Sequence, residues 1–171
     1  MKKDWIPILN ICLLLVLGCT DPSEYLPDII TVNLELSSTS TDFESLKLDI
    51  QEVAIKGAVT GQEAANSTFA GMYEMKELVS DALDLARFEV DYDSLLQVKV
   101  SFGTENSLVK EAETHQLMMP ADFDGTLVIP FGRYIQDQKE WNIRLQLQSD
   151  ASVMQAGADE YIFDPQMIII N

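Results

Sequence analysis

Cysteine, histidine and basic residues are all scarce in this 171-residue chain. Its two cysteines are Cys12, inside an apolar leader, and Cys19, directly after it. The rest of the chain therefore has no thiol for a disulfide, a thiolate metal site or a cysteine nucleophile. His115 is the only histidine, and a zinc site or a His-based triad needs partners that one imidazole cannot supply alone. We interpret His115 as an ordinary strand residue and expect no catalytic residues.

Positive charge is also scarce, with 11 Lys and Arg against 28 Asp and Glu and a formal net charge of −17. Phosphate backbones repel so acidic a body, which argues against nucleic-acid binding. The simplest interpretation is a soluble, self-repelling surface, and the alternative is attraction of cations or of a basic partner. Glycine loops for phosphate and the common hydrolase and metalloprotease motifs are missing as well.

Residues 1–18 have the pattern of a bacterial export signal. Lys2 and Lys3 precede an apolar stretch over 6–17, which is too short to span a bilayer comfortably. Val16-Leu17-Gly18-Cys19 then resembles the lipobox of lipoprotein precursors, in which the cysteine accepts diacylglycerol. We predict a lipoprotein signal peptide over 1–18 and lipidation of Cys19, the alternative being an ordinary signal peptide with a chance cysteine.

Residues 19–28 contain two prolines and no apolar period, so they predict a lipidated tether. Acidic residues close to Cys19 are similar to surface-export signals of some Gram-negative lipoproteins. The prediction is a protein anchored in the outer membrane by its lipid, facing the periplasm or, as the favoured side, the cell surface. Residues 29–171 then have the size of one domain.

Strand patterns dominate this domain. Apolar and polar residues alternate over 30–36, 46–50, 96–102 and 141–147. The alternation slips by one residue at Gln51-Glu52, which predicts a β-bulge. Residues 103–106 predict a hairpin turn, and the apolar spacing over 78–87 fits a short helix. Roughly seven to nine strands with turns about every ten residues predict an all-β antiparallel sandwich.

Four stretches resemble an uncharacterised family of secreted bacterial and archaeal lipoprotein domains. They are Leu46 to Ile55, Ala82 to Leu85, Leu96 to Gly103 with Asn106-Ser107, and Trp141 to Val153 continuing to Phe163-Asp164-Pro165-Gln166-Met167-Ile168. Their order spans nearly all of 30–170, although Glu89-Val90-Asp91-Tyr92 replaces a Pro-Ala-Gly turn common in the family. The resemblance implies an immunoglobulin-like or prealbumin-like β-sandwich and brings no catalytic residues.

Two acidic loops are candidate metal sites. Asp91 and Asp93 lie in one, and Asp122 and Asp124 lie in the other, before Gly125. Calcium takes six to eight oxygen ligands, and such loops supply some of them. Neither loop continues into an EF-hand pattern, and Asp and Gly also favour turns without any ion. We expect no obligatory cofactor, with calcium as the alternative.

The C-terminal segment is a candidate partner-binding strand. Met167, Ile168, Ile169 and Ile170 are apolar on both faces, whereas a strand with one solvated face alternates. The cover for the second face is either one of the domain's own loops or a short helix, such as the 78–87 segment, or a partner protein.

These features predict a non-catalytic, lipid-anchored binding or assembly module that serves a larger outer-membrane or cell-surface complex through an envelope protein partner. The alternative is a surface lipoprotein that binds glycans or calcium at its loops. A carboxylate-based hydrolase ranks last, because in so acidic a chain paired carboxylates arise by chance.

Overall fold

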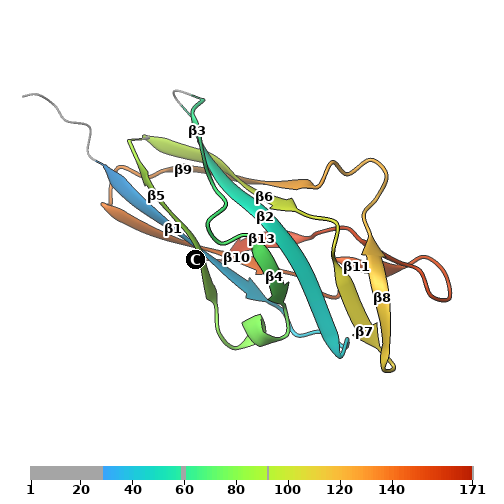
Figure 1. Ribbon diagram of the computed structural model, residues 1–171. Coiled ribbons are helices and arrows are strands. Elements are labelled where there is room, and N and C mark those ends of the chain that lie inside the picture. The colour runs from blue at the N-terminus through green and yellow to red at the C-terminus, as the bar shows by residue number, and fades with distance from the viewer. Residues whose placement is uncertain (1–28, 59–60, 92, 171) are drawn as a thin grey trace, which may run out of the picture.

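A computed structural model describes residues 29–58, 61–91 and 93–170. Two β-sheets pack face to face around one apolar core, and a 3-10 turn, η1 (Glu77–Val79), is the only helical element in these ranges (Figure 1). The predicted all-β sandwich is confirmed. In these ranges thirteen strands replace the predicted seven to nine, because short strands such as β3 (Glu63–Asn66) and β11 (Val153–Gln155) have too few residues to show a clear alternation.

The smaller sheet has the order β13-β10-β1-β5. Its strands are β13 (Met167–Ile170), β10 (Glu140–Leu147), β1 (Ile30–Ser38) and β5 (Leu83–Val90). β1 runs parallel to β10, and the other two pairs are antiparallel. We refer to it as the four-stranded sheet.

The larger sheet is built around β2 (Ser45–Gly57). Its other strands are β3 (Glu63–Asn66), β4 (Gly71–Glu74), β6 (Ser94–Phe102), β7 (Ser107–Lys110), β8 (Glu113–Met118), β9 (Thr126–Tyr134), β11 (Val153–Gln155) and β12 (Tyr161–Phe163). β12 runs parallel to β8. Both sheets are therefore mixed: the pairs β1–β10 and β12–β8 are parallel, and the other described pairs are antiparallel, as predicted.

The predicted hairpin at 103–106 is wrong, because β6 and β7 both pair with β2 and not with each other. Lys47 of β2 pairs with Glu74 of β4 on one edge and with Ser107 of β7 on the other, so β6 and β7 follow one another along the same edge. Asn106, which is fully buried, bridges the interruption. Its side chain accepts a hydrogen bond from the Asp49 amide at 2.8 Å and donates one to the Gly103 carbonyl at 2.7 Å.

The bulge predicted at Gln51-Glu52 is confirmed, since Ile50 pairs with Phe102 and Glu52 with the adjacent Ser101. This leaves Gln51 as the extra residue. Before the bulge the inward apolar residues of β2 have even residue numbers, and after it they have odd numbers. They face the core on both sides of the bulge.

The helix predicted over 78–87 is wrong, because its second half belongs to β5. A second bulge explains the misleading spacing: Leu34 pairs with Ala86 and Glu35 with Asp84, so Leu85 is extra. Buried Leu85 and Ala86 are therefore consecutive and imitate a helical period. A bulged strand and one turn of an amphipathic helix give the same local pattern.

The core lies between the sheets and consists of the inward residues of both. Val32, Leu34 and Leu36 of β1 have no exposed surface. Phe163 meets Phe102 edge to face at 5.2 Å, which attaches β12 to the main core. Within the described ranges no helix is long and apolar enough to cross a membrane.

Candidate functional site

The outer face of the four-stranded sheet carries a continuous array of polar side chains. Because successive strand residues point to opposite faces, burial of Val32 and Leu34 turns Asn33 and Glu35 outward. The register places Asn142 opposite Asn33 and Arg144 opposite Glu35, so β1 and β10 present matched polar rows.

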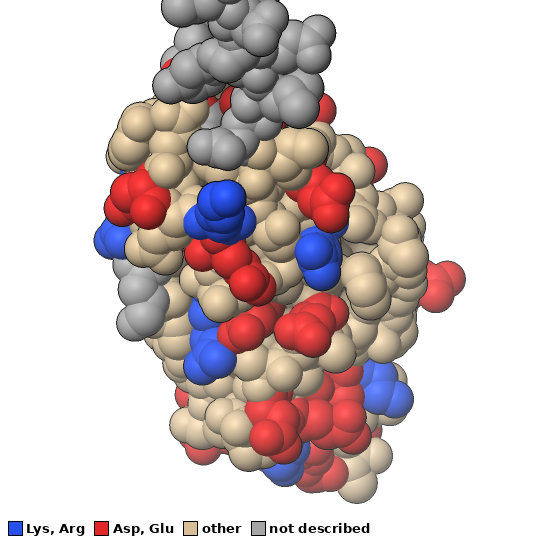
Figure 2. Space-filling model, turned by 90° about the vertical axis from the view of Figure 1, so that its left-hand side faces the viewer, with Lys and Arg blue, Asp and Glu red and all other residues tan. Residues whose placement is uncertain are grey.

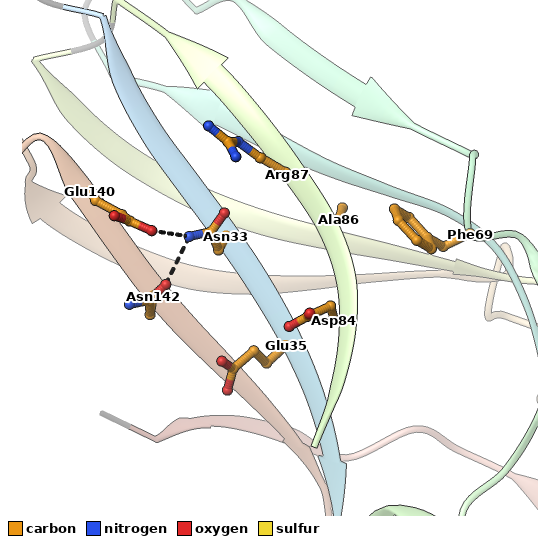
Figure 3. Close-up of a pocket in the computed structure, with 8 residues that line it drawn as sticks. All are labelled: Asn33, Glu35, Phe69, Asp84, Ala86, Arg87, Glu140 and Asn142. Atoms are coloured by element: carbon orange, nitrogen blue, oxygen red, sulfur yellow. Dashed lines mark hydrogen bonds between the residues drawn. The ribbon is translucent and has the colours of Figure 1, made fainter. Parts of the chain in front are cut away.

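Two hollows of about 340 and 350 Å³ lie on this face. Both are bordered by Glu35 and Asn142, so the two hollows are adjacent, and we call them together the sheet groove. Phe69 and Ala86 border it at the β5 side (Figure 3), and Ile170 borders it at the β13 side, so the groove runs across the strands. The remaining lining residues are Asn33, Asp84, Arg87, Glu140 and Arg144.

Hydrogen bonds orient the polar floor of the groove. The Asn33 amide nitrogen donates to Glu140 Oε1 at 2.8 Å and to Asn142 Oδ1 at 2.9 Å, as Figure 3 shows. Arg144 donates through Nε to Glu35 Oε2 at 2.8 Å, and its Nη2 lies 2.7 Å from the same oxygen. Asp84, the pairing neighbour of Glu35, has no hydrogen-bond partner among the residues that the structure describes.

The groove combines both signs of charge. Three carboxylates and two guanidinium groups line it, so their charges nearly cancel. Figure 2 likewise shows acidic and basic side chains interspersed, without a continuous basic patch on the face displayed. Neither a strongly anionic ligand nor a wholly apolar one fits such a lining.

Phe69 reaches the groove from the larger sheet. It lies in the turn between β3 and β4, where the Tyr73 hydroxyl donates a hydrogen bond to its backbone carbonyl. The Phe69 side chain is 44% exposed at the groove end. Burial raises the pKa of Tyr73 above its usual 10.

The two acidic loops lie at opposite ends of the β6–β9 ladder. Asp93 precedes Ser94, which pairs with Tyr134, whereas Asp124 precedes Thr126, which pairs with Ser101. At a rise of about 3.4 Å per residue this separates the loops by roughly 24 Å. Asp91 and Asp122 are both exposed.

The two aspartates nearest the ladder have protein partners. Asp124 Oδ1 accepts a hydrogen bond from the Thr126 amide at 2.9 Å, and Asp93 accepts one from the Gln136 side chain. Over 29–58, 61–91 and 93–170, no three His, Cys, Asp or Glu side chains gather as a metal site. The Asp124 contact is one that a turn makes without any ion.

β13 lies at an edge of the four-stranded sheet. Met167 and Ile169 pair with the fully buried Leu147 and Leu145 and pack on the core, which leaves Ile168 and Ile170 on the outer face. β5, which contains much of the 78–87 segment, occupies the opposite edge, so the suggestion that this segment covers β13 was wrong. No other strand of the described chain pairs with the free edge of β13.

Two further predicted residues are placed as follows. His115 lies on β8, with its ring 4.9 Å from that of Tyr161. Cys19, with the predicted signal peptide and tether, lies outside the described residues.

The sheet groove was not predicted from the sequence. The alternating polar positions of β1 and β10 are visible in the sequence. Only the pairing of these two strands, however, brings Asn33 next to Asn142, which lies 109 residues later in the chain. Comparison with protein-family models, curated proteins and solved structures finds no match to this chain.

Proposed function

We propose that this protein is a non-catalytic, lipid-anchored component of the bacterial cell envelope that binds a partner protein in an outer-membrane or cell-surface complex. The lipobox-like Val16-Leu17-Gly18-Cys19 supports the anchor. The resemblance to secreted lipoprotein domains without assigned catalytic residues supports a binding role.

The observation that carries the proposal is the apolar character of the edge strand β13. Sheet edges offer unpaired N–H and C=O groups, and proteins usually protect them with lysine, proline or inward charges. β13 has the sequence Met-Ile-Ile-Ile without any such residue, and Ile168 is 47% exposed on it. An edge of this kind favours the addition of another strand.

The partner contributes an extended segment that pairs with β13. Backbone hydrogen bonds supply affinity in this mode, and alternate side chains of the added strand supply specificity. Its outward residues contact Ile168 and Ile170, so we expect apolar or aromatic side chains there.

A photo-reactive amino acid at position 168, introduced into the full chain in its own membranes, tests the proposal. We expect a crosslink to an extended segment of one envelope protein, mapped by mass spectrometry, and loss of the complex in Ile168→Lys. Met154→Lys is the matched control, because Met154 is 48% exposed on β11, an edge strand of the other sheet.

Three results would contradict the proposal. They are a crosslink between two copies of this chain, no crosslinked protein at all, and an Ile168→Lys variant that retains the partner. If Ile168→Lys and Met154→Lys have equal melting temperatures, loss of the complex in Ile168→Lys does not arise from unfolding.

A further inference from the structure

We propose that the sheet groove binds a neutral, linear oligosaccharide. The inference goes beyond the partner-binding role and does not depend on it, because the floor of the groove lies on β1 and β10, and the groove shares only Ile170 with the edge strand β13. It assigns a ligand class to residues that the sequence patterns left unassigned.

The floor of the groove has the hydrogen-bonding chemistry that sugar hydroxyls need. A hydroxyl both donates and accepts, and planar amide, carboxylate and guanidinium groups offer both kinds of partner in fixed directions. The contacts of Asn33 with Glu140 and Asn142 hold these groups in place before a ligand arrives. The Asp84 carboxylate, with no partner among the described residues, is an available acceptor.

The shape of the groove favours a chain over a single ring. It extends from β5 to β13, three strand spacings or about 14 Å. The two hollows, at about 340 and 350 Å³, each lie at the lower end of the usual size of small-molecule sites. Two such hollows in a row, joined at Glu35 and Asn142, suit successive units of one linear ligand.

Apolar groups at both ends complement the other face of a sugar. Pyranose rings carry C–H groups as well as hydroxyls, and an exposed aromatic ring is a suitable surface for them. Phe69 supplies one at the β5 end, and Ile170 supplies an aliphatic surface at the β13 end. Most ligand sites combine apolar walls with a few placed polar groups in this way.

The charge of the groove selects for a neutral ligand. Its three carboxylates and two guanidinium groups give a small negative excess, within a chain of net charge −17. A uronic-acid or phosphorylated glycan brings further negative charge into this field, so its association is opposed.

Isothermal titration of the full chain in mild detergent tests the inference with defined probes. Maltotriose, cellotriose, xylotriose and mannotriose are the neutral set, and trigalacturonate is the anionic comparison. We expect at least one neutral trisaccharide to bind and trigalacturonate not to bind. The double variant Asn33→Ala/Asn142→Ala should then weaken binding about tenfold or more, because it removes two side chains that hydrogen-bond to the sugar hydroxyls.

Two further variants locate the site. Phe69→Ala should weaken binding about fivefold or more if the ring contacts the sugar. Gln97→Ala, a polar change on the outer face of the larger sheet, should leave binding unchanged. Melting temperatures of all variants establish that they are folded.

Absence of binding to all four neutral probes would overturn the inference, as would unchanged affinity in the Asn33→Ala/Asn142→Ala variant or tighter binding of trigalacturonate. The Ile168→Lys variant distinguishes failure of this inference from failure of the partner-binding proposal. This variant should lose the protein partner and keep the trisaccharide, since Ile168 does not line the groove.

Discussion

Replacement of Asn106 by alanine should be among the most damaging polar substitutions in this protein. The side chain has no exposed surface, and it holds together the point where β6 ends and β7 begins. Its Oδ1 accepts from the Asp49 amide at 2.8 Å and its Nδ2 donates to the Gly103 carbonyl at 2.7 Å. Alanine leaves both backbone groups without their partner.

Each unsatisfied buried polar group destabilises a protein by about 1–3 kcal/mol. Because the Asp49 amide is only partly buried, we expect Asn106→Ala to lower the free energy of unfolding by about 2–4 kcal/mol. That is a large share of the roughly 5–15 kcal/mol typical of a domain. With a urea dependence of about 2 kcal/mol per molar, the unfolding midpoint should fall by roughly 1–2 M.

Urea unfolding followed by tryptophan fluorescence and circular dichroism measures this loss. Asn142→Ala, a change on the solvent-facing side of the four-stranded sheet, is the control and should alter stability by less than about 1 kcal/mol. Asn106→Asp keeps the acceptor for the Asp49 amide but buries a charge, so it should be at least as harmful as alanine. A loss below about 1 kcal/mol in Asn106→Ala would refute the idea that this side chain joins the two strands.

Four other outcomes follow from the structure. Gly103→Ala places a Cβ 1.8 Å from an Asp49 carboxylate oxygen, but that side chain can rotate away, so urea unfolding should show a smaller loss than for Asn106→Ala. Phe163→Ala removes a fully buried ring and should destabilise by about 3–5 kcal/mol in the same assay, with Phe163→Leu recovering part of this. The raised pKa of Tyr73 means that the unfolded chain loses this proton first, so the stability it contributes is complete below pH 10 and declines as the pH rises through its folded pKa. Melting curves from pH 8 to 11 should therefore fall more steeply for the natural protein than for Tyr73→Phe, and parallel curves would contradict the assignment. Millimolar calcium should leave the melting temperature unchanged, because partners within the protein already occupy carboxylates of both acidic loops, and a rise of several degrees would restore the calcium alternative.

The alternation of apolar residues was sufficient to predict the sandwich and several of its strands. The inward residues of β1 and β10 alternate with outward residues. The slip in this alternation at Gln51 correctly predicted the bulge in β2. These features are local, so one strand contains all the information that specifies them. The same reasoning was wrong for 78–87, where the bulge at Leu85 imitates a helical spacing.

The sequence patterns did not predict which strands pair with each other. Glycine and asparagine at 103–106 have the composition of a hairpin turn, yet the buried Asn106 side chain lets the chain continue along β2. The groove depends on the same kind of information, because Asn33 and Asn142 meet only through a parallel pairing of distant strands. Local composition does not distinguish a turn that reverses the chain from one that does not.

The parallel pairing of β1 with β10 also determines when the protein can fold. β1 is the first strand of the described domain, and both of its neighbours come later, β10 at residues 140–147. Contacts so distant in sequence close large loops and slow the folding reaction. During synthesis, the four-stranded sheet cannot be completed until almost all of the described chain has emerged. Late closure of this kind makes the groove one of the last surfaces of the protein to form.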